Sequence, residues 1–297
     1  MRPRSAIALA GAVLLLAVVL AGCSPKTSGL YVYDWSIFWD SVLRPSPRII
    51  NGIGLTVSIA ITSQVIGVIL GVFGALGRLA RFRPARYLAN FYVWIFRGTP
   101  LLVQIMFLYY GLLVTHLYSW PDLTLLGITL PSAIQAGIFA LGVNEGAYMT
   151  EIVRAGILSV DPGQLEAARS LGMTYPTAMR RIVLPQAARV VVPPLGNEFN
   201  NMLKTTSLLV VVAVPELFVT FNQLNGSGPT SFHPFELFLA CAIWFLLLTT
   251  IWSVIQAFIE RRVGRGFAGE RPPGLFDRLF GSRLRRAGEP IQTAGGR

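Results

Sequence analysis

The sequence is poor in charge and in the residues on which most enzyme chemistry depends. Only 13% of its 297 residues are charged, whereas soluble domains carry about 25%. Its two cysteines, Cys23 and Cys241, are too few for a disulfide framework. Its two histidines, His116 and His233, stand in expected loops without a metal-ligand cluster or a nucleophile–base set nearby. The sequence therefore favours no class of enzyme.

Lysine is also scarce, and this excludes the usual nucleotide site. Neither Lys26 nor Lys204 follows a glycine, so the chain has no GxxxxGK[ST] phosphate loop. We expect no cofactor, no metal and no ATP hydrolysis in this chain. The net charge of +11 comes from arginines that stand between apolar segments. That distribution reports orientation in a membrane and argues against a nucleic-acid partner.

Long hydrophobic runs dominate the rest of the chain. Hydrophobic residues make up 53% of the sequence, and the mean hydropathy is +0.59. A bilayer core of about 30 Å needs about 20 apolar residues per helix, and these runs are too long for the alternating strands of a barrel. The sequence predicts an all-α integral membrane protein. Its five core spans are expected at about 53–76, 99–118, 131–150, 190–224 and 235–259.

Residues 1–23 have the form of a secretory signal, with a basic start, an apolar stretch and Leu-Ala-Gly-Cys at the end. That ending resembles the cleavage box of bacterial lipoproteins, in which Cys23 would carry lipid. An uncleaved signal anchor with a chance cysteine is the alternative. Both interpretations place residues 24–52 outside the cell, where Trp35 and Trp39 suit an interfacial helix.

Arginines predict the topology of the core. The segments 78–86 and 154–189 and the basic tail 261–297 are rich in arginine, whereas the connections 115–131 and 225–234 contain no lysine or arginine. By the positive-inside rule, the core starts outside the cell and the C-terminus is cytoplasmic. We expect the tail to be mostly disordered and to rest on membrane lipid.

The cytoplasmic segment 161–187 predicts two short helices joined by a turn. Asp161 suits a helix cap with Pro162 in the first turn, and Gly172 suits the left-handed residue that ends a helix. Pro176 begins the second helix, which Leu184-Pro185 is expected to end. A plain soluble hairpin is the alternative interpretation.

The residues of this segment also resemble a known motif, the EAA motif of ABC-importer permeases. Longer stretches at 96–104, 146–173 and 184–209 resemble the polar amino-acid permeases, the family of the histidine, glutamine, glutamate and arginine permeases. The resemblance implies a type I ABC importer transmembrane fold over residues 53–260. It also implies that residues of the motif couple the chain to an ATPase. They are Glu166, Ala167, Ala168, Gly172, Ile182, Leu184 and Pro185.

The resemblance implies partners as well. Cytoplasmic ABC ATPase subunits would bind the ATP, and an extracytoplasmic binding protein would deliver the amino-acid substrate. A second permease subunit, identical or related, would complete the pathway in a bacterial cytoplasmic membrane.

The fourth expected span is unusually polar. Ionisable residues cost about 2.5–3.5 kcal/mol at the centre of a membrane helix, so we expect its polar side chains to face protein or water. One interpretation is a translocation path, and the alternative is hydrogen bonding between subunits. The proline residues 193, 194 and 215 are expected to bend or interrupt the helix. The candidate path residues are Asn197, Glu198, Asn201, Lys204, Thr205 and Ser207, with Glu145 from the third span.

Three other functions compete with an amino-acid importer. An ABC permease for another small solute would share the EAA motif. An uncoupled channel or secondary transporter would not need a segment that contacts an ATPase. A lipid-anchored scaffold is supported only by Cys23.

Overall fold

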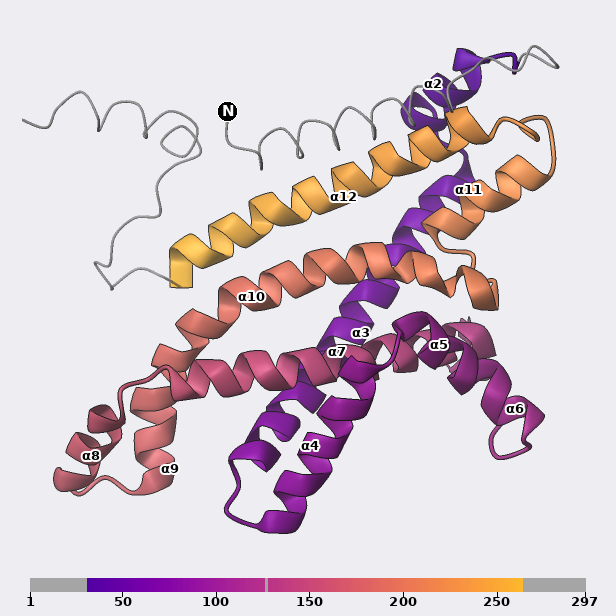
Figure 1. The fold of residues 1–297 in the computed structure, drawn as a ribbon. Coiled ribbons are helices and arrows are strands. Elements are labelled where there is room, and N and C mark those ends of the chain that lie inside the picture. The colour runs from indigo at the N-terminus through magenta and orange to yellow at the C-terminus, as the bar shows by residue number, and fades with distance from the viewer. Residues whose placement is uncertain (1–30, 126–127, 264–297) are drawn as a thin grey trace, which may run out of the picture. The chain divides into compact units, whose positions relative to one another are not determined.

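The computed structural model describes residues 31–125 and 128–263, and it is predominantly helical (Figure 1). The candidate signal segment, Cys23 and most of the basic tail lie outside the described residues. The chain divides into two compact units, and the divisions along the sequence fall inside helices α3 (Pro47–Leu79) and α12 (Pro234–Val263) and after residue 214.

The smaller unit combines residues 31–54 with residues 215–244. It contains α2 (Trp35–Leu43), α11 (Leu217–Gly226) and the first parts of α3 and α12. Asp34 caps α2, because its carboxylate accepts the backbone N–H of Ser36 at 3.0 Å. The hydroxyl and N–H of Ser36 hold the pKa of this carboxyl below its usual value.

The larger unit combines residues 55–214 with the second part of α12. After α3 its elements follow in chain order. They are α4 (Arg83–Gly98), α5 (Leu101–Met106), the π-helical turn η1 (Phe107–Gly111), α6 (Leu112–Val114), strands β1 (Leu123–Leu125) and β2 (Ile128–Leu130), α7 (Ser132–Leu158), α8 (Pro162–Ser170), α9 (Tyr175–Ala178), the π-helical turn η2 (Met179–Val183), α10 (Leu184–Thr205) and the 3-10 helix η3 (Thr206–Val212).

The two strands form a small antiparallel hairpin that the sequence interpretation did not anticipate. Thr124 pairs with Thr129, and Leu123 pairs with Leu130. The threonine hydroxyls lie 3.1 Å apart across the hairpin. Short alternation of leucine, isoleucine and threonine favours this pairing.

Helix α7 is the most deeply buried long helix of the larger unit, and it packs against α4, α5 and α10. Glycines let α3 approach it closely. A Cβ built at Gly71 would lie 2.2 Å from the Cβ of Met149, and one at Gly74 would lie 2.1 Å from the hydroxyl of Thr150. Small residues permit this approach between membrane helices, where van der Waals contact drives association.

Two described helices, α3 and α12, are long and apolar enough to cross a membrane. The number rises to four if each of two bent helix pairs counts as one span. One of these pairs joins α4 to the run from α5 to α6, with a bend of 105°. Helix α7 occupies the expected third span.

The structure differs from the expected second span. The arginine-rich connection expected at 78–86 is partly helical, because helix α4 begins at Arg83 and continues to Gly98. Its arginines lie near the two ends, and between them Ala89 and Val93 are buried on one side. The helix that follows the bend begins at Leu101 and ends at Val114, so it is shorter than the expected 99–118.

The fourth expected span, 190–224, is interrupted in the structure. Two of its three prolines do not cause the interruption. Pro193 and Pro194 lie inside the continuous helix α10. The interruption falls between η3 and α11, where Ala213 adopts a left-handed φ of 55° and Pro215 follows. Pro215 lacks a backbone N–H, so it suits this break.

The expected helix end at Leu184-Pro185 is wrong. The chain stays helical from α9 through η2 into α10. A proline ring clashes with the carbonyl four residues earlier, here that of Arg181. Arg181 lies in the π-helical turn, whose wider winding accommodates the ring.

Gly71→Ala is expected to lower the thermal stability of the protein in detergent. Overpacking costs about 1–3 kcal/mol, which exceeds the gain of about 1 kcal/mol from replacing a helical glycine by alanine. The matched control is Gly54→Ala on the same helix, where an added Cβ meets nothing within 4 Å. Equal melting temperatures for the two variants would contradict the close approach of α3 to α7.

Candidate coupling segment and polar cavity

The coupling segment, residues 161–187, begins with a capped helix. The carboxylate of Asp161 accepts the N–H of Gly163 at 2.7 Å, which confirms the predicted cap of α8. Just after the C-terminal end of α8, Gly172 has a φ of +79°. Its N–H donates to the carbonyl of Arg169 at 2.9 Å, and the N–H of Met173 donates to that of Ala168 at 3.0 Å. This pair of bonds is a Schellman motif, which makes the turn into α9 rigid.

The motif residues divide between a buried and an exposed side. Ala168 is 1% exposed, whereas Glu166, Ala167 and Gly172 are exposed. Ile182 is half-buried, and Leu184 and Pro185 are exposed in the continuous helix.

Leu171, at the end of α8, is 83% exposed.

A polar cavity of about 500 Å³ lies between α7 and α10. It unites five of the seven candidate path residues. They are Glu145 from α7 and Glu198, Asn201, Lys204 and Thr205 from α10. Asn144 and Tyr148 of α7 also line it. The cavity therefore presents carboxylates, a lysine and amides.

The other two candidate path residues lie elsewhere. The side-chain oxygen of Asn197 accepts the amide of Gln256, on α12, at 3.2 Å. The hydroxyl of Ser207 donates to the carbonyl of Lys204 at 2.7 Å. Neither side chain lines the cavity. Ser207 follows the change from α10 to the 3-10 helix η3 at Thr206, so it departs from the face of α10 that lines the cavity.

Glu145 is buried at the wall of this cavity. Its side chain is 6% exposed in the protein, and the amide of Gln64 on α3 donates to it at 3.2 Å. A Cβ at Gly67 would collide with the Glu145 side chain. Helix α3 thus fixes the position of this carboxyl group.

The bend between α4 and α5 is held by amide hydrogen bonds. Gln104 donates to the carbonyls of Phe96 at 2.9 Å and Thr99 at 3.0 Å. Asn144 of α7 donates to the side-chain oxygen of Gln104 at 2.9 Å and to the carbonyl of Phe96 at 3.0 Å. A residue that lines the cavity therefore also fixes the bend.

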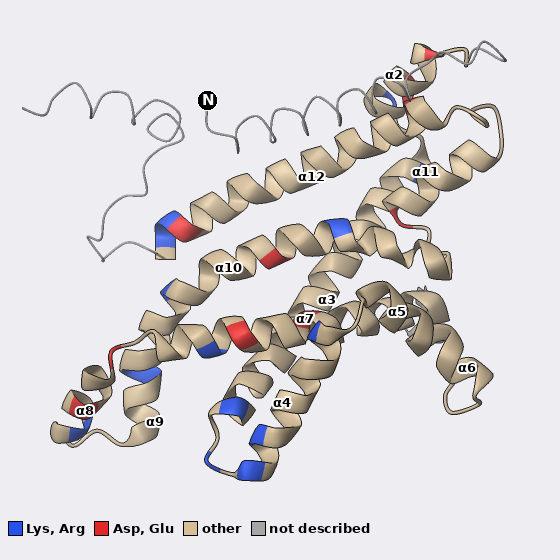
Figure 2. Cartoon of the chain, in the orientation of Figure 1, with Lys and Arg blue, Asp and Glu red and all other residues tan. Residues whose placement is uncertain are grey.

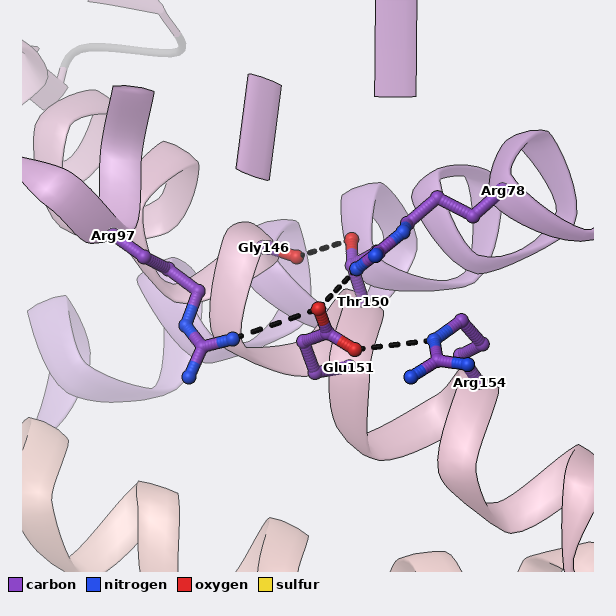
Figure 3. Close-up of polar contacts among 6 residues, drawn as sticks. All are labelled: Arg78, Arg97, Gly146, Thr150, Glu151 and Arg154. Carbon is purple, nitrogen blue, oxygen red and sulfur yellow. Dashed lines mark hydrogen bonds and ion pairs between the residues drawn. The ribbon is translucent and has the colours of Figure 1, made fainter. Parts of the chain in front are cut away.

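Three arginines surround Glu151 of α7, a group called here the arginine cluster (Figure 3). Arg78 of α3 donates to one carboxylate oxygen, and Arg154 donates to the other at 3.1 Å. Arg97 at the end of α4 lies 3.6 Å from the first oxygen. Glu151 and Arg154 lie three residues apart on α7, while Arg78 and Arg97 come from distant parts of the sequence.

Comparison with known proteins identifies the family. The family described as "Binding-protein-dependent transport system inner membrane component" matches residues 65–265, more than half of the chain. The chain belongs to this family of permeases. The matched range includes both the coupling segment and the polar cavity.

Individual relatives cover most of this permease. The arginine transport system permease protein ArgU of Corynebacterium glutamicum is 38% identical over 79% of this chain and 73% of its own length. The probable amino-acid permease protein YxeN of Bacillus subtilis is 36% identical over 78% of this chain and 98% of its own.

Solved structures establish the fold of the permease. The crystal structure of an amino acid ABC transporter with histidines matches 78% of this chain and 100% of its own, with 36% identity and a TM-score of 0.66. A chain of the MetNI methionine ABC transporter, in inward-facing conformations, shares the fold at 17% identity over 73% of this chain and 96% of its own, with a TM-score of 0.58. The protein is therefore a multi-pass membrane protein with the type I ABC importer fold.

Glu151→Gln is expected to destabilise the permease by about 2 kcal/mol, because a neutral amide weakens by about half two charged hydrogen bonds of about 1.5–3 kcal/mol each. The substitution removes the negative charge that three guanidinium groups share. Arg154→Gln, which removes one of the three, should cost less. Chemical unfolding of both variants in detergent measures the difference. A Glu151→Gln variant no less stable than Arg154→Gln would contradict the role given to this carboxylate.

Proposed function

We propose that this chain is the transmembrane permease subunit of an ATP-driven importer of polar amino acids. A separate ATPase subunit binds and hydrolyses the ATP, and an extracytoplasmic binding protein delivers the substrate. Two permease subunits, identical or related, enclose the pathway in the cytoplasmic membrane of a bacterium. The named relatives for arginine and for amino acids in general support the substrate class.

The observation that carries the proposal is the continuity between coupling segment and cavity. Helix α7 supplies Glu145 to the cavity and leads into α8. Helix α10 supplies Glu198 and Lys204, and it grows out of η2 at the other end of the coupling segment. A push on the segment therefore reaches both walls of the cavity through rigid helices.

The charges of the cavity suit an amino acid. A zwitterion needs an acceptor for its ammonium group and a cation for its carboxylate. Glu145 and Glu198 can serve the first, and Lys204 can serve the second. In the membrane such groups are costly unless they face protein or a water-filled path.

The distribution of charge within the larger unit supports the orientation. Arginines gather at the α3–α4 connection and in the coupling segment (Figure 2). The described residues from 115 to 131 at the α6–β2 side contain no lysine or arginine. By the positive-inside rule the coupling segment is cytoplasmic.

The mechanism follows from this arrangement. ATP closes the two ATPase subunits and draws the two coupling segments together. Helices α7 and α10 move with them, so the cavity opens outward and receives the amino acid from the binding protein. ATP hydrolysis then opens the cavity to the cytoplasm again.

Gly172→Asp is expected to abolish ATP-driven uptake by liposomes that contain the permease, its ATPase and its binding protein. An unpaired carboxylate at the ATPase contact costs several kcal/mol, so uptake falls at least about tenfold. The control is Gly228→Asp, since Gly228 also has a positive φ of +89° and open space around its Cα. That variant should keep wild-type uptake.

Three outcomes of this assay would overturn parts of the proposal. Uptake without ATP, or unchanged in Gly172→Asp, would support an uncoupled transporter. ATP-driven uptake of another small solute, with no response to a panel of amino acids, would reject the substrate class. Equal losses in the two variants would reject the coupling segment as the site of the effect.

Lys204→Gln is expected to lower amino-acid uptake about tenfold, because loss of one charge-assisted hydrogen bond of about 1.5 kcal/mol has this effect. Ser207→Ala, three residues away but outside the cavity, should leave uptake unchanged. Initial rates of uptake in liposomes provide the measurement. Loss in Ser207→Ala with none in Lys204→Gln would show that the cavity is not the path.

A further inference from the structure

The arginine cluster carries more positive charge than its carboxylate neutralises. Three guanidinium groups face one carboxylate, so the cluster has an excess charge of about +2. Arg78 and Arg154 already donate to the two oxygens of Glu151. The third arginine, Arg97, makes no normal hydrogen bond to this carboxylate, so its N–H groups remain available to another anion.

The geometry of Arg97 agrees with this. Its Nη1 is 3.6 Å from the nearer oxygen of Glu151, beyond a normal hydrogen bond. Its side chain is 42% exposed, more than those of Arg78 at 22% and Arg154 at 32%. Within residues 31–125 and 128–263, the contacts of its guanidinium are this ion pair and an aromatic ring.

That ring connects Arg97 to the polar cavity. The guanidinium carbon lies 5.1 Å from the ring centre of Tyr148, and Tyr148 lines the cavity. The bend that follows Arg97 is fixed by Asn144, which lines the same cavity. Arg97 thus has a defined place beside Tyr148, a residue of the cavity wall.

The order of residues along the helices indicates which end this is. On α7, Tyr148 and Glu151 follow Glu145 toward the coupling segment, at a rise of about 1.5 Å per residue. On α10, Lys204 lies at the end farthest from that segment. Lys204 and Arg97 are therefore cations toward opposite ends of the cavity.

We propose that Arg97 is a second contact for the substrate carboxylate, at the cytoplasmic end of the cavity. The carboxylate meets Lys204 when the substrate enters and passes to the guanidinium of Arg97 before release. A planar guanidinium binds a carboxylate through two parallel hydrogen bonds. This inference rests on the proposed function and on the cytoplasmic position of the coupling segment.

The test compares Arg97→Gln with Arg97→Lys and with Arg154→Gln as the control. Arg154 shares Glu151 but is not stacked on a residue of the cavity. The variants are reconstituted with the ATPase and the binding protein, using whichever amino acid of a panel the wild type takes up. Two rates are measured, ATP hydrolysis stimulated by the loaded binding protein and amino-acid uptake.

Arg97→Gln should keep stimulated hydrolysis within about twofold of wild type while uptake per ATP falls about tenfold, the effect of one lost charged hydrogen bond. Arg97→Lys should recover most of the wild-type ratio of amino-acid uptake to ATP hydrolysis. Arg154→Gln should change hydrolysis and uptake in proportion. An unchanged ratio in Arg97→Gln, or a proportional loss like that of Arg154→Gln, overturns the inference.

A lipid headgroup is the rival anion, and liposome composition distinguishes it. The inference predicts the same deficit of Arg97→Gln in liposomes with and without phosphatidylglycerol. If wild type falls to the level of Arg97→Gln when this anionic lipid is omitted, Arg97 serves the headgroup and the inference fails. Absence of ATP-driven uptake by the wild type for every amino acid would instead reject the proposed function, and this inference with it.

Discussion

The constraint on which the structure depends is that α7 carries polar and charged groups through the membrane. Lipid offers these groups no hydrogen bonds, so neighbouring helices must supply them. Gln64 of α3 donates to Glu145, and Asn144 donates to the bend after α4. The glycines of α3 permit the close approach that such contacts require. The fold is thus organised around the partners of one helix.

This arrangement also explains how one segment can act on the cavity. The coupling segment is not a loop attached to the membrane domain, because both of its ends continue as helices that line the cavity. The Schellman motif at Gly172 keeps its turn rigid. The arginine cluster ties α3 and α4 to α7 near the same end. Force applied to the segment is therefore shared by several helices.

Features set by local sequence were predictable, while those set by distant contacts were not. The long apolar helices and the cap at Asp161 follow from composition and short-range signals. The contact of Arg97 with Tyr148 joins residues far apart in the chain, so no local pattern contains it. Helix α4 was missed because its arginines suggest a loop, although its buried face is regular. Pro185 was misinterpreted because a π-helical turn accommodates it.

Cross-linking can show whether the tip of the coupling segment contacts the ATPase subunit. A cysteine replaces Leu171, which is 83% exposed, in a chain whose Cys23 and Cys241 are serine. Phe232→Cys, at an 82% exposed site in an expected outer loop, is the control. A photoactivatable thiol reagent is expected to link Leu171→Cys, and not Phe232→Cys, to the ATPase. Absence of that adduct, or equal adducts from both positions, would contradict this contact.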